Sequence, residues 1–203
     1  MNKLAGFLPM YTIEEAGNAE QTLQKSRFIA WASQTTSEQH ALEFLRVIAT
    51  QHVSAHHLAF AYRVKTLKAI VPRFSDAGEP SGTAGKPILQ MLEGRELINV
   101  CVGVIRYYGG VNLGTGGLAR AYSGTAKLAL KAALIMPFIE MQEFALNVAY
   151  SRVDELIKLV LQLKGRVLNK VFTDEAQLTI SLPIVHVDNI KKRFHQKPLL
   201  IMH

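Results

Sequence analysis

A single cysteine, Cys101, is present in the 203 residues of the sequence. One thiol cannot form an intrachain disulfide, so the class of small disulfide-stabilised proteins is excluded, and so are zinc sites built from several cysteines. Cys101 stands in the middle of an apolar run, where we expect it to be a small core residue.

Long hydrophobic segments are absent as well. No stretch approaches the length that crosses a bilayer. The apolar residues at the N-terminus are interrupted by Pro9 and followed by Glu14 and Glu15, unlike a secretory signal. These absences predict a soluble, cytoplasmic protein with no membrane partner. The apolar fraction of 49% is enough for a substantial core in one or two domains.

Acidic residues are missing from one long part of the chain. Between residues 97 and 139 there is no Asp or Glu, although Arg106, Arg120, Lys127 and Lys131 all fall there. The whole chain has a formal charge of +7. This charge balance favours nucleic acid, a phosphorylated ligand or an acidic protein as the partner.

The same part of the chain shows the pattern of a strand, a glycine-rich turn and a helix. The apolar, β-branched run 98–105 predicts a central strand that is covered on both faces. A helix is expected from about residue 117 to residue 134. Its spacing predicts one apolar face and an opposite face that carries Arg120, Lys127 and Lys131 at i, i+7 and i+11.

The turn before this helix suits an anion. The first amides of a helix have no intrahelical partner and lie at the positive end of its dipole, so a flexible glycine turn there can wrap phosphate or carboxylate oxygens. The predicted anion site consists of Gly109, Gly110, Gly114, Thr115, Gly116, Gly117 and Arg120. In the alternative interpretation the glycines only make a tight turn and the basic residues only solvate the helix.

A second cluster of turn residues, RFSDAGEPSGTAGKP, occupies residues 73–87. We expect it to lie near the first cluster at one end of the sheet and to form the rim of a pocket. The predicted rim consists of Asp76, Glu79, Ser81, Gly82, Thr83, Gly85 and Lys86. Thr83 is predicted to cap a short helix that has Pro87 in its first turn and Gly94 beyond its end.

Established catalytic and cofactor motifs do not fit the chain. Gly114, Gly116 and Ala119 match G-x-G-x-x-A, but the predicted strand ends well before them and no acid follows at the ribose-binding spacing. Pro87 replaces the Ser or Thr of a Walker motif. Neither H-E-x-x-H nor G-x-S-x-G occurs. We therefore predict no catalytic residue, no metal and no cofactor, and interpret Asp76 and Glu79 as turn-stabilising acids.

The remaining pattern predicts an α+β protein of two domains, 1–137 and 138–203. Before the glycine-rich segments we expect strands at 11–13 and 26–33, a helix from a capping box at Thr36 and Gln39 to about residue 50, and a half-covered strand at 57–64. After Pro137 the elements are predicted in the order strand 144–150, helix 153–164, strands 167–172 and 178–182, helix 187–195 and strand 199–202. This βαββαβ order is ferredoxin-like.

Three segments resemble the IMPACT family in its bacterial YigZ-type form. They are KSRFIA from Lys25, DAGEPSGTAGKP from Asp76 and VIRYYGGVNLGTGGLARAY from Val104. The resemblance implies a first domain similar to the second domain of a small-subunit ribosomal protein. It also implies a ferredoxin-like second domain, similar to the last domain of elongation factor G. Ala77 departs from the family, which usually carries a second acid there.

The resemblance also implies a theme for the function, because eukaryotic relatives regulate translation by binding a ribosome-associated activator of a starvation-responsive kinase. The first hypothesis is a non-catalytic binding protein, associated with translation regulation, that contacts RNA, the ribosome or a translation-linked protein. The residues expected to contact nucleic acid are Arg106, Arg120, Lys127 and Lys131.

The second hypothesis is a protein or enzyme that holds a phosphorylated small molecule in the pocket between 78–86 and 109–117. A kinase-like site needs a base and magnesium ligands beside the phosphate turn. Only Asp76 and Glu79 of the other loop are available. This shortage favours binding over chemistry.

Overall fold

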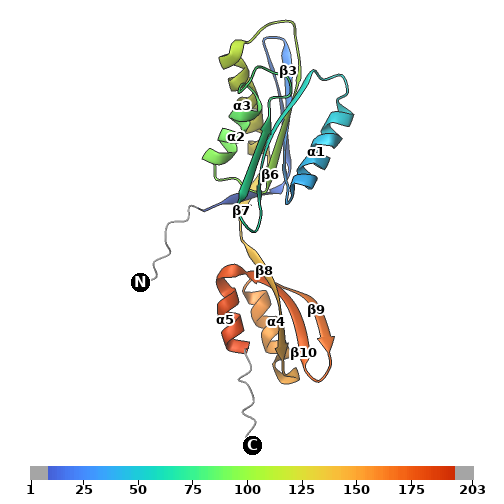
Figure 1. Ribbon diagram of the computed structural model, residues 1–203, viewed down its shortest axis with the longest axis vertical. Coiled ribbons are helices and arrows are strands. Elements are labelled where there is room, and N and C mark those ends of the chain that lie inside the picture. Colours follow the sequence, from blue (N-terminus) through green and yellow to red (C-terminus); the bar gives the residue numbers. More distant parts are fainter. Residues whose placement is uncertain (1–8, 195–203) are drawn as a thin grey trace, which may run out of the picture. The chain divides into compact units, whose positions relative to one another are not determined.

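The computed structural model describes residues 9–194, whose elements are labelled in Figure 1. Contacts within the chain divide it into two compact units that meet between Phe138 and Ile139. We predict that the two units are independent domains in solution, with their boundary between residues 137 and 138. No helix in residues 9–194 is both long enough and apolar enough to cross a membrane.

The first unit is built on a five-stranded antiparallel sheet. Its strand order is β2 (Gly17–Leu23), β3 (Ser26–Gln34), β6 (Val100–Tyr107), β4 (His57–Lys65) and β5 (Ile70–Ser75). Helices α2 (Gly85–Gly94) and α3 (Gly114–Ala132) pack on one face. Helix α1 (Glu38–Gln51) packs on the other, so that the sheet is the middle of three layers (Figure 1).

Strand β6 lies at the centre of this sheet, and all of its residues except Tyr107 are buried. The prediction of a strand covered on both faces is therefore confirmed, and Cys101 is a core residue with no exposed area. The strand begins at Val100 rather than at residue 98, because Asn99 has a positive φ of 53° that interrupts extended backbone. Gly103 lets α1 approach, since a Cβ there would lie 2.9 Å from a Leu45 methyl carbon.

Three expectations about local structure were wrong. Strand β4 is covered on both faces, because Ala59 and Ala61 are fully buried in the core under α2 and α3. Helix α1 is capped by Ser37, whose Oγ accepts from the backbone N of His40 at 3.0 Å, and not by Thr36. Helix α3 begins at Gly114, three residues before the predicted start.

Strands β2, β5 and β7 (Leu134–Pro137) were not predicted. Strands β2 and β5 form the two edges of the sheet, where polar residues are tolerated and a clear alternation is lost. Strand β7 pairs with β1 (Tyr11–Glu15) in a separate antiparallel ribbon. The N–H of Phe138 continues this ribbon by donating to the carbonyl of Met10 at 2.8 Å.

The second unit has three strands and two α-helices in its described part. They are β8 (Met141–Val148), a 3-10 turn (Tyr150–Arg152), α4 (Val153–Gln162), β9 (Arg166–Phe172), β10 (Ala176–Pro183) and α5 (Ile184–Phe194). The sheet has the antiparallel order β8-β10-β9. This matches the first five elements of the predicted order. The sixth, strand 199–202, lies outside the described residues, so the ferredoxin-like fold stays a prediction.

The core of this unit lies between the sheet and the two helices. Leu156 and Val160 of α4 and Ile190 of α5 are fully buried against Leu178 and Ile180 of β10. Each unit therefore has an apolar core of its own.

We expect the two units to fold independently because each has its own core. A protease recognition sequence inserted between Phe138 and Ile139 should allow the chain to be cut without changing the thermal unfolding midpoint of either piece, measured by circular dichroism. If either piece lost cooperative unfolding after the cut, the chain would be one folding unit.

Candidate functional site

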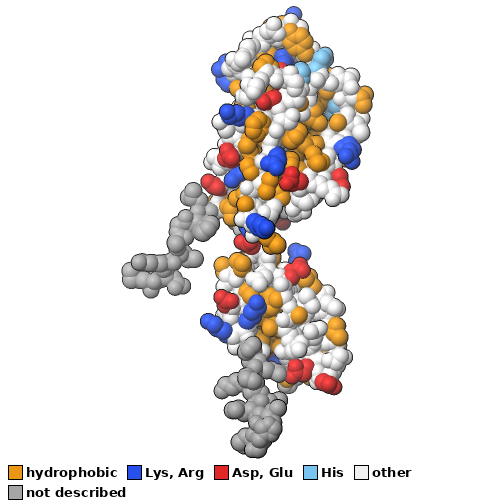
Figure 2. Space-filling model, in the orientation of Figure 1, with side chains coloured by type: hydrophobic (Ala, Val, Ile, Leu, Met, Phe, Trp, Pro, Cys, Tyr) orange, Lys and Arg blue, Asp and Glu red, His pale blue; other side chains and the backbone are white. Residues whose placement is uncertain are grey.

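Four connections meet at one end of the five-stranded sheet, the upper end in Figure 1. The register pairs Arg27 with Tyr107, His57 with Arg106, and Phe60 with Ser75. Segments 24–25, 52–56, 76–84 and 108–113 therefore lie together, and we call this region the loop end. The expectation that the two glycine-rich segments lie at the same end of the sheet is confirmed. In Figure 2, histidine side chains appear around this end.

Asp76 organises the second glycine-rich segment. Its carboxylate accepts backbone N–H groups from Gly82 at 2.8 Å, Ala84 at 2.9 Å and Gly85 at 2.8 Å, at the start of α2. Burial alone would raise the pKa of Asp76, but hydrogen bonds from these amides and from that of Lys86 outweigh it and hold the pKa below its ordinary value. Asp76 therefore satisfies amides that a helix start leaves without partners.

Thr83 does not cap α2 as predicted. Its hydroxyl donates to the carbonyl of Pro80 at 2.6 Å, and the N-cap residue, Ala84, makes no side-chain cap. Asp76 reaches the helix start because Ala77, Gly78 and Gly82 all have positive φ and fold the loop back on itself. The interpretation of Asp76 as a turn-stabilising acid is confirmed.

Glu79 ties the same loop to the sheet and to α3. One oxygen, Oε1, accepts from Nη1 of Arg106 and from the hydroxyl of Tyr122, both at 2.8 Å. The side chains of Glu79 and Arg106 are each 5% exposed. Burial, and then the hydrogen bond to Glu79, raise the pKa of Tyr122, so this hydroxyl remains a donor. Nε2 of His57 lies 3.9 Å from the same oxygen, while its Nδ1 donates to the carbonyl of Ala77.

Ser26 extends this contact to the first glycine-rich turn. Its hydroxyl oxygen accepts from Nη2 of Arg106 at 3.3 Å and from the backbone N of Gly109 at 3.2 Å. A Cβ on Gly109 would lie 2.0 Å from the carbonyl oxygen of Lys25, so only glycine fits. We call Glu79, Arg106, Tyr122 and Ser26 the Glu79 network. The amide of Gly109 is engaged by the fold and is not open to an anion.

The other residues of the predicted anion site surround the start of α3. Gly110, Gly114, Thr115 and Gly116 are exposed, and the first two have positive φ. No side chain caps this helix start, and its first turn contains no acid. Gly117 and Arg120 line a cavity of about 310 Å³. Its other wall comes from β2 and the turn after it, through Gln21, Leu23 and Gln24.

The predicted pocket rim is mostly used by the fold itself. Of its seven residues, only Ser81 and Lys86 are exposed. Gly85 is buried, and a Cβ there would lie 2.3 Å from the carbonyl oxygen of Ser75. The backbone N–H of Gly82 donates a hydrogen bond to the Asp76 carboxylate. Across residues 9–194, no three His, Cys, Asp or Glu side chains come close enough together to hold a metal ion.

The basic residues do not all share one surface. Arg120, Lys127 and Lys131 are exposed along α3, whereas Leu118, Ala121 and Tyr122 of the same helix are buried. Arg106 lies elsewhere, with its guanidinium carbon 5.0 Å from the centre of the Tyr108 ring and 5.5 Å from that of Phe28. Arg106 was expected to contact nucleic acid together with these three residues, but its side chain is buried and its charge is paired with Glu79 inside the protein.

Sequence reasoning also missed two members of the Glu79 network. The helical spacing predicts only a place on the apolar face of α3 for Tyr122, and the pattern of 26–33 predicts only a strand start for Ser26. The same signal was available for both, since Ser26 lies in KSRFIA and Tyr122 ends VIRYYGGVNLGTGGLARAY, two of the three segments that carry the family resemblance. No sequence spacing indicates that Tyr122 reaches Glu79, 43 positions away.

Asp76→Asn should lower the free energy of unfolding of the first unit by about 1–2 kcal/mol at neutral pH, as losing a helix cap does. Because the folded pKa of Asp76 is depressed, its contribution is complete above the ordinary carboxyl pKa of about 3.9 and is lost as pH falls below it. Denaturant unfolding from pH 7 to pH 3 should show the difference from wild type shrinking with acid. Glu93→Gln, at an exposed position of α2, is the control. A difference that is independent of pH would contradict this role.

Glu79→Gln should destabilise the first unit by about 3–5 kcal/mol, because it leaves the Arg106 charge buried without a counter-charge. Tyr122→Phe removes one neutral donor to the same carboxylate and should cost only about 0.5–1.5 kcal/mol. Denaturant unfolding of both variants measures the two costs. Similar small costs would show that the ion pair does not hold the loop.

Comparison of the chain with known proteins identifies its family. Residues 24–130 match the family model described as the Impact N-terminal domain. The chain is 46% identical over 112 residues to the IMPACT family member YvyE of Bacillus subtilis, an alignment covering 55% of this chain and 51% of that relative. It therefore spans about half the length of that relative.

Two further similarities cover most of the chain. The IMPACT family member YigZ of Escherichia coli is 32% identical over 180 residues, which are 88% of this chain and 85% of the relative. A crystal structure described as that of a hypothetical protein covers 92% of both chains, with 29% identity and a TM-score of 0.69. Since the Impact N-terminal domain takes up more than half of the residues and the likeness to YigZ extends over most of both chains, this protein belongs to the IMPACT family, in its YigZ type.

Proposed function

We propose that this protein is a non-catalytic binding protein associated with translation regulation, and that it contacts RNA or the ribosome through phosphate groups. The observation that supports the RNA contact is the row of Arg120, Lys127 and Lys131 on α3, which are all exposed. We call these three residues the α3 row. The link to translation comes from membership of the IMPACT family, whose eukaryotic members regulate translation.

The geometry of the α3 row suits a chain of phosphates. At about 1.5 Å of rise per residue, the three Cα atoms are spaced roughly 10 Å and 6 Å along the helix axis. There is no Asp or Glu between residues 97 and 139 to oppose them. The start of α3, which no side chain caps, adds the positive end of the helix dipole to the same element.

The state of the two nearby carboxylates supports binding rather than chemistry. A general base must reach the proton that it removes. Asp76 is held by backbone amides of its own loop, and Glu79 by Arg106 and Tyr122. Both acids are thus occupied in positioning the loop end, while the α3 row has side chains that extend into solvent.

A phosphorylated small molecule is the second candidate ligand. It is favoured by the cavity of about 310 Å³ that Gly117 and Arg120 line. That volume is at the lower limit of typical small-molecule sites, which begin at roughly 300 Å³. A small phosphate ester would use Arg120 without the two lysines, so the two candidates differ in their need for Lys127 and Lys131.

Replacing the α3 row together, R120Q with K127Q and K131Q, should weaken binding to ribosomes and to RNA. For about three phosphate contacts on a single strand, the logarithm of affinity should fall against the logarithm of salt with a slope of roughly −2 in the wild type and close to zero in the variant. Glutamine nearly preserves helix propensity, so helicity by circular dichroism should not change.

The matched control removes the same charge from other exposed positions of the first unit, with R46Q, K68Q and R73Q. Affinity is measured by sedimentation with ribosomes and by fluorescence anisotropy with labelled RNA across a salt series. The proposal predicts that the control keeps the wild-type slope. Equal affinities of the wild type and the α3 variant would remove the α3 row from the function, and a phosphate ester that still bound with K127Q and K131Q in place would favour the second candidate.

A further inference from the structure

Helix α1 leaves part of its face of the sheet uncovered. Its buried residues Ala41 and Leu45 pack with residues of β4 and β6. Beyond them, on the β3 and β2 side, Trp31 is half-buried and Asn18 is exposed. These two residues are cross-strand partners and so lie on the same face.

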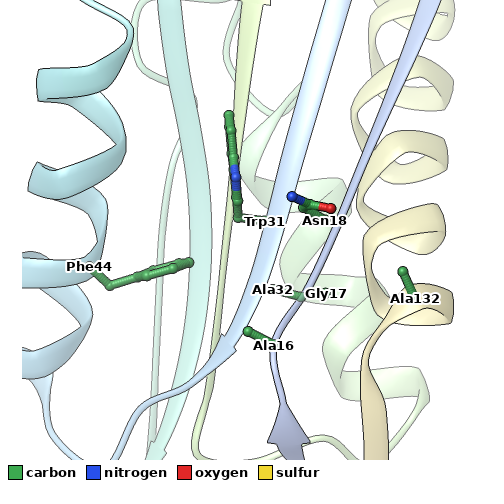
Figure 3. A pocket seen from close by; sticks show the side chains of 7 residues that line it. All are labelled: Ala16, Gly17, Asn18, Trp31, Ala32, Phe44 and Ala132. Atoms are coloured by element: carbon green, nitrogen blue, oxygen red, sulfur yellow. The ribbon is translucent and has the colours of Figure 1, made fainter.

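A cavity of about 220 Å³ lies at the β2 edge of the sheet, where Trp31, Asn18 and Phe44 line it from the α1 side and Ala132 of α3 lines it from the other side. Figure 3 shows the Phe44 ring extending from α1 toward the sheet, Trp31 standing on β3, and Asn18 on the neighbouring strand β2. Ala16, Gly17, Ala32 and Ala132 complete the lining. The volume is below the roughly 300–1,000 Å³ of drug-sized sites, so it suits a single ring rather than a whole small molecule.

Aromatic rings continue from this cavity to the loop end. The centres of the Trp31 and His52 rings are 5.0 Å apart, and Nδ1 of His52 shares a hydrogen bond of 2.9 Å with the hydroxyl of Tyr107. The guanidinium carbon of Arg27 lies 5.6 Å from the centre of the Tyr107 ring. We call Trp31, His52, Tyr107 and Arg27 the aromatic row.

We propose that the aromatic row and the cavity bind unpaired bases of a single-stranded RNA, with one base stacked on Trp31. The inference rests on the proposed RNA binding and adds the class of RNA, since bases in a duplex are stacked on one another and cannot enter this cavity. Sheet faces that bind single strands do so through aromatic rings, with polar side chains for the base edges and cations for the phosphates.

Each part of that chemistry is present on this face. The Asn18 amide offers both a donor and an acceptor to a base edge. Arg27 and Lys25, both exposed, stand beside the end of the row where a backbone would pass. The hairpin that carries Arg27 and Trp31 also borders, through Gln21 and Gln24, the cavity that Gly117 and Arg120 line. One strand of RNA could therefore follow the hairpin from the α3 row to Trp31.

Glu20 is an acidic group beside the aromatic row, and its charge opposes RNA. Both of its oxygens accept from Arg27, at 2.6 Å and 2.7 Å, and Arg27 holds the pKa of Glu20 below its ordinary value. This ion pair is exposed on both sides, so it contributes little to stability and a phosphate can compete for Arg27. Removing the Glu20 charge should therefore increase affinity for RNA.

Trp31 is the only tryptophan of the chain, so its emission reports on this cavity alone. The test is to titrate the full chain with a 12-nucleotide oligoadenylate, and in parallel with the same strand paired to oligouridylate. We expect saturable quenching of Trp31 by the single strand and little change with the duplex.

Variants measured by anisotropy with labelled oligoadenylate complete the test. Trp31→Leu should weaken single-strand binding by about tenfold, the loss of one stacked base, while binding of the duplex stays unchanged. Trp31→Phe should keep part of the affinity. Tyr150→Leu removes an exposed aromatic ring of the second unit and should have no effect. Glu20→Gln should tighten binding at low salt, whereas Glu143→Gln, an exposed acid of β8, should not.

The outcomes separate this inference from the proposed function. If oligoadenylate bound with the salt slope of the α3 row but neither quenched Trp31 nor depended on it, the inference would be overturned and the α3 proposal would stand. If no RNA bound to the wild type, both would fail. Quenching by a proline-rich peptide and not by RNA would assign the cavity to a protein partner and overturn the inference as well.

Discussion

The buried ion pair between Glu79 and Arg106 is the constraint on which the loop end depends. Each side chain is 5% exposed, and a charge in such a place is strongly destabilising unless its partner stays with it. Glu79 comes from the glycine-rich loop and Arg106 from the central strand, and Tyr122 of α3 donates to the same oxygen. Three elements are thus held at one point. With the loop in that position, Asp76 meets the start of α2, and Ser26 meets the turn at Gly109.

This arrangement indicates a structural role for the glycine-rich segments that carry the family resemblance. Their acids, and the amide of Gly109, are satisfied by the protein itself, so much of both segments serves to build the loop end. What remains outside is the exposed α3 row on one side of the β2–β3 hairpin and the aromatic row on the other. Cations and aromatic rings are suited to bind a phosphate chain and its bases rather than to transfer protons, and Glu20, the carboxylate beside the aromatic row, is paired with Arg27.

How far the sequence predicts this structure follows from the range of the interactions. The central strand and the basic face of α3 were predictable, because periodicity within a short segment determines which side chains are buried. Strand β4 was misjudged because alanines, which leave room for a helix, alternate in it with larger residues as exposed positions would. The edge strands β2 and β5 have no apolar alternation to reveal them. The burial of Arg106 was not predictable, since its partner lies 27 positions away and no local pattern joins the two.

The exposed anion-site residues and the nucleic-acid contacts of the α3 row stay predictions.

The central proposal to test is that RNA contacts the first unit around the β2–β3 hairpin and α3. Ultraviolet cross-linking of the purified wild-type protein to RNA, followed by mass spectrometry of the cross-linked peptides, tests it without any substitution. We expect cross-links in residues 18–31, in 107–108 and along 114–131, and few in the second unit. Cross-links confined to residues 139–194, or absent under conditions where a known RNA-binding protein is labelled, would contradict it.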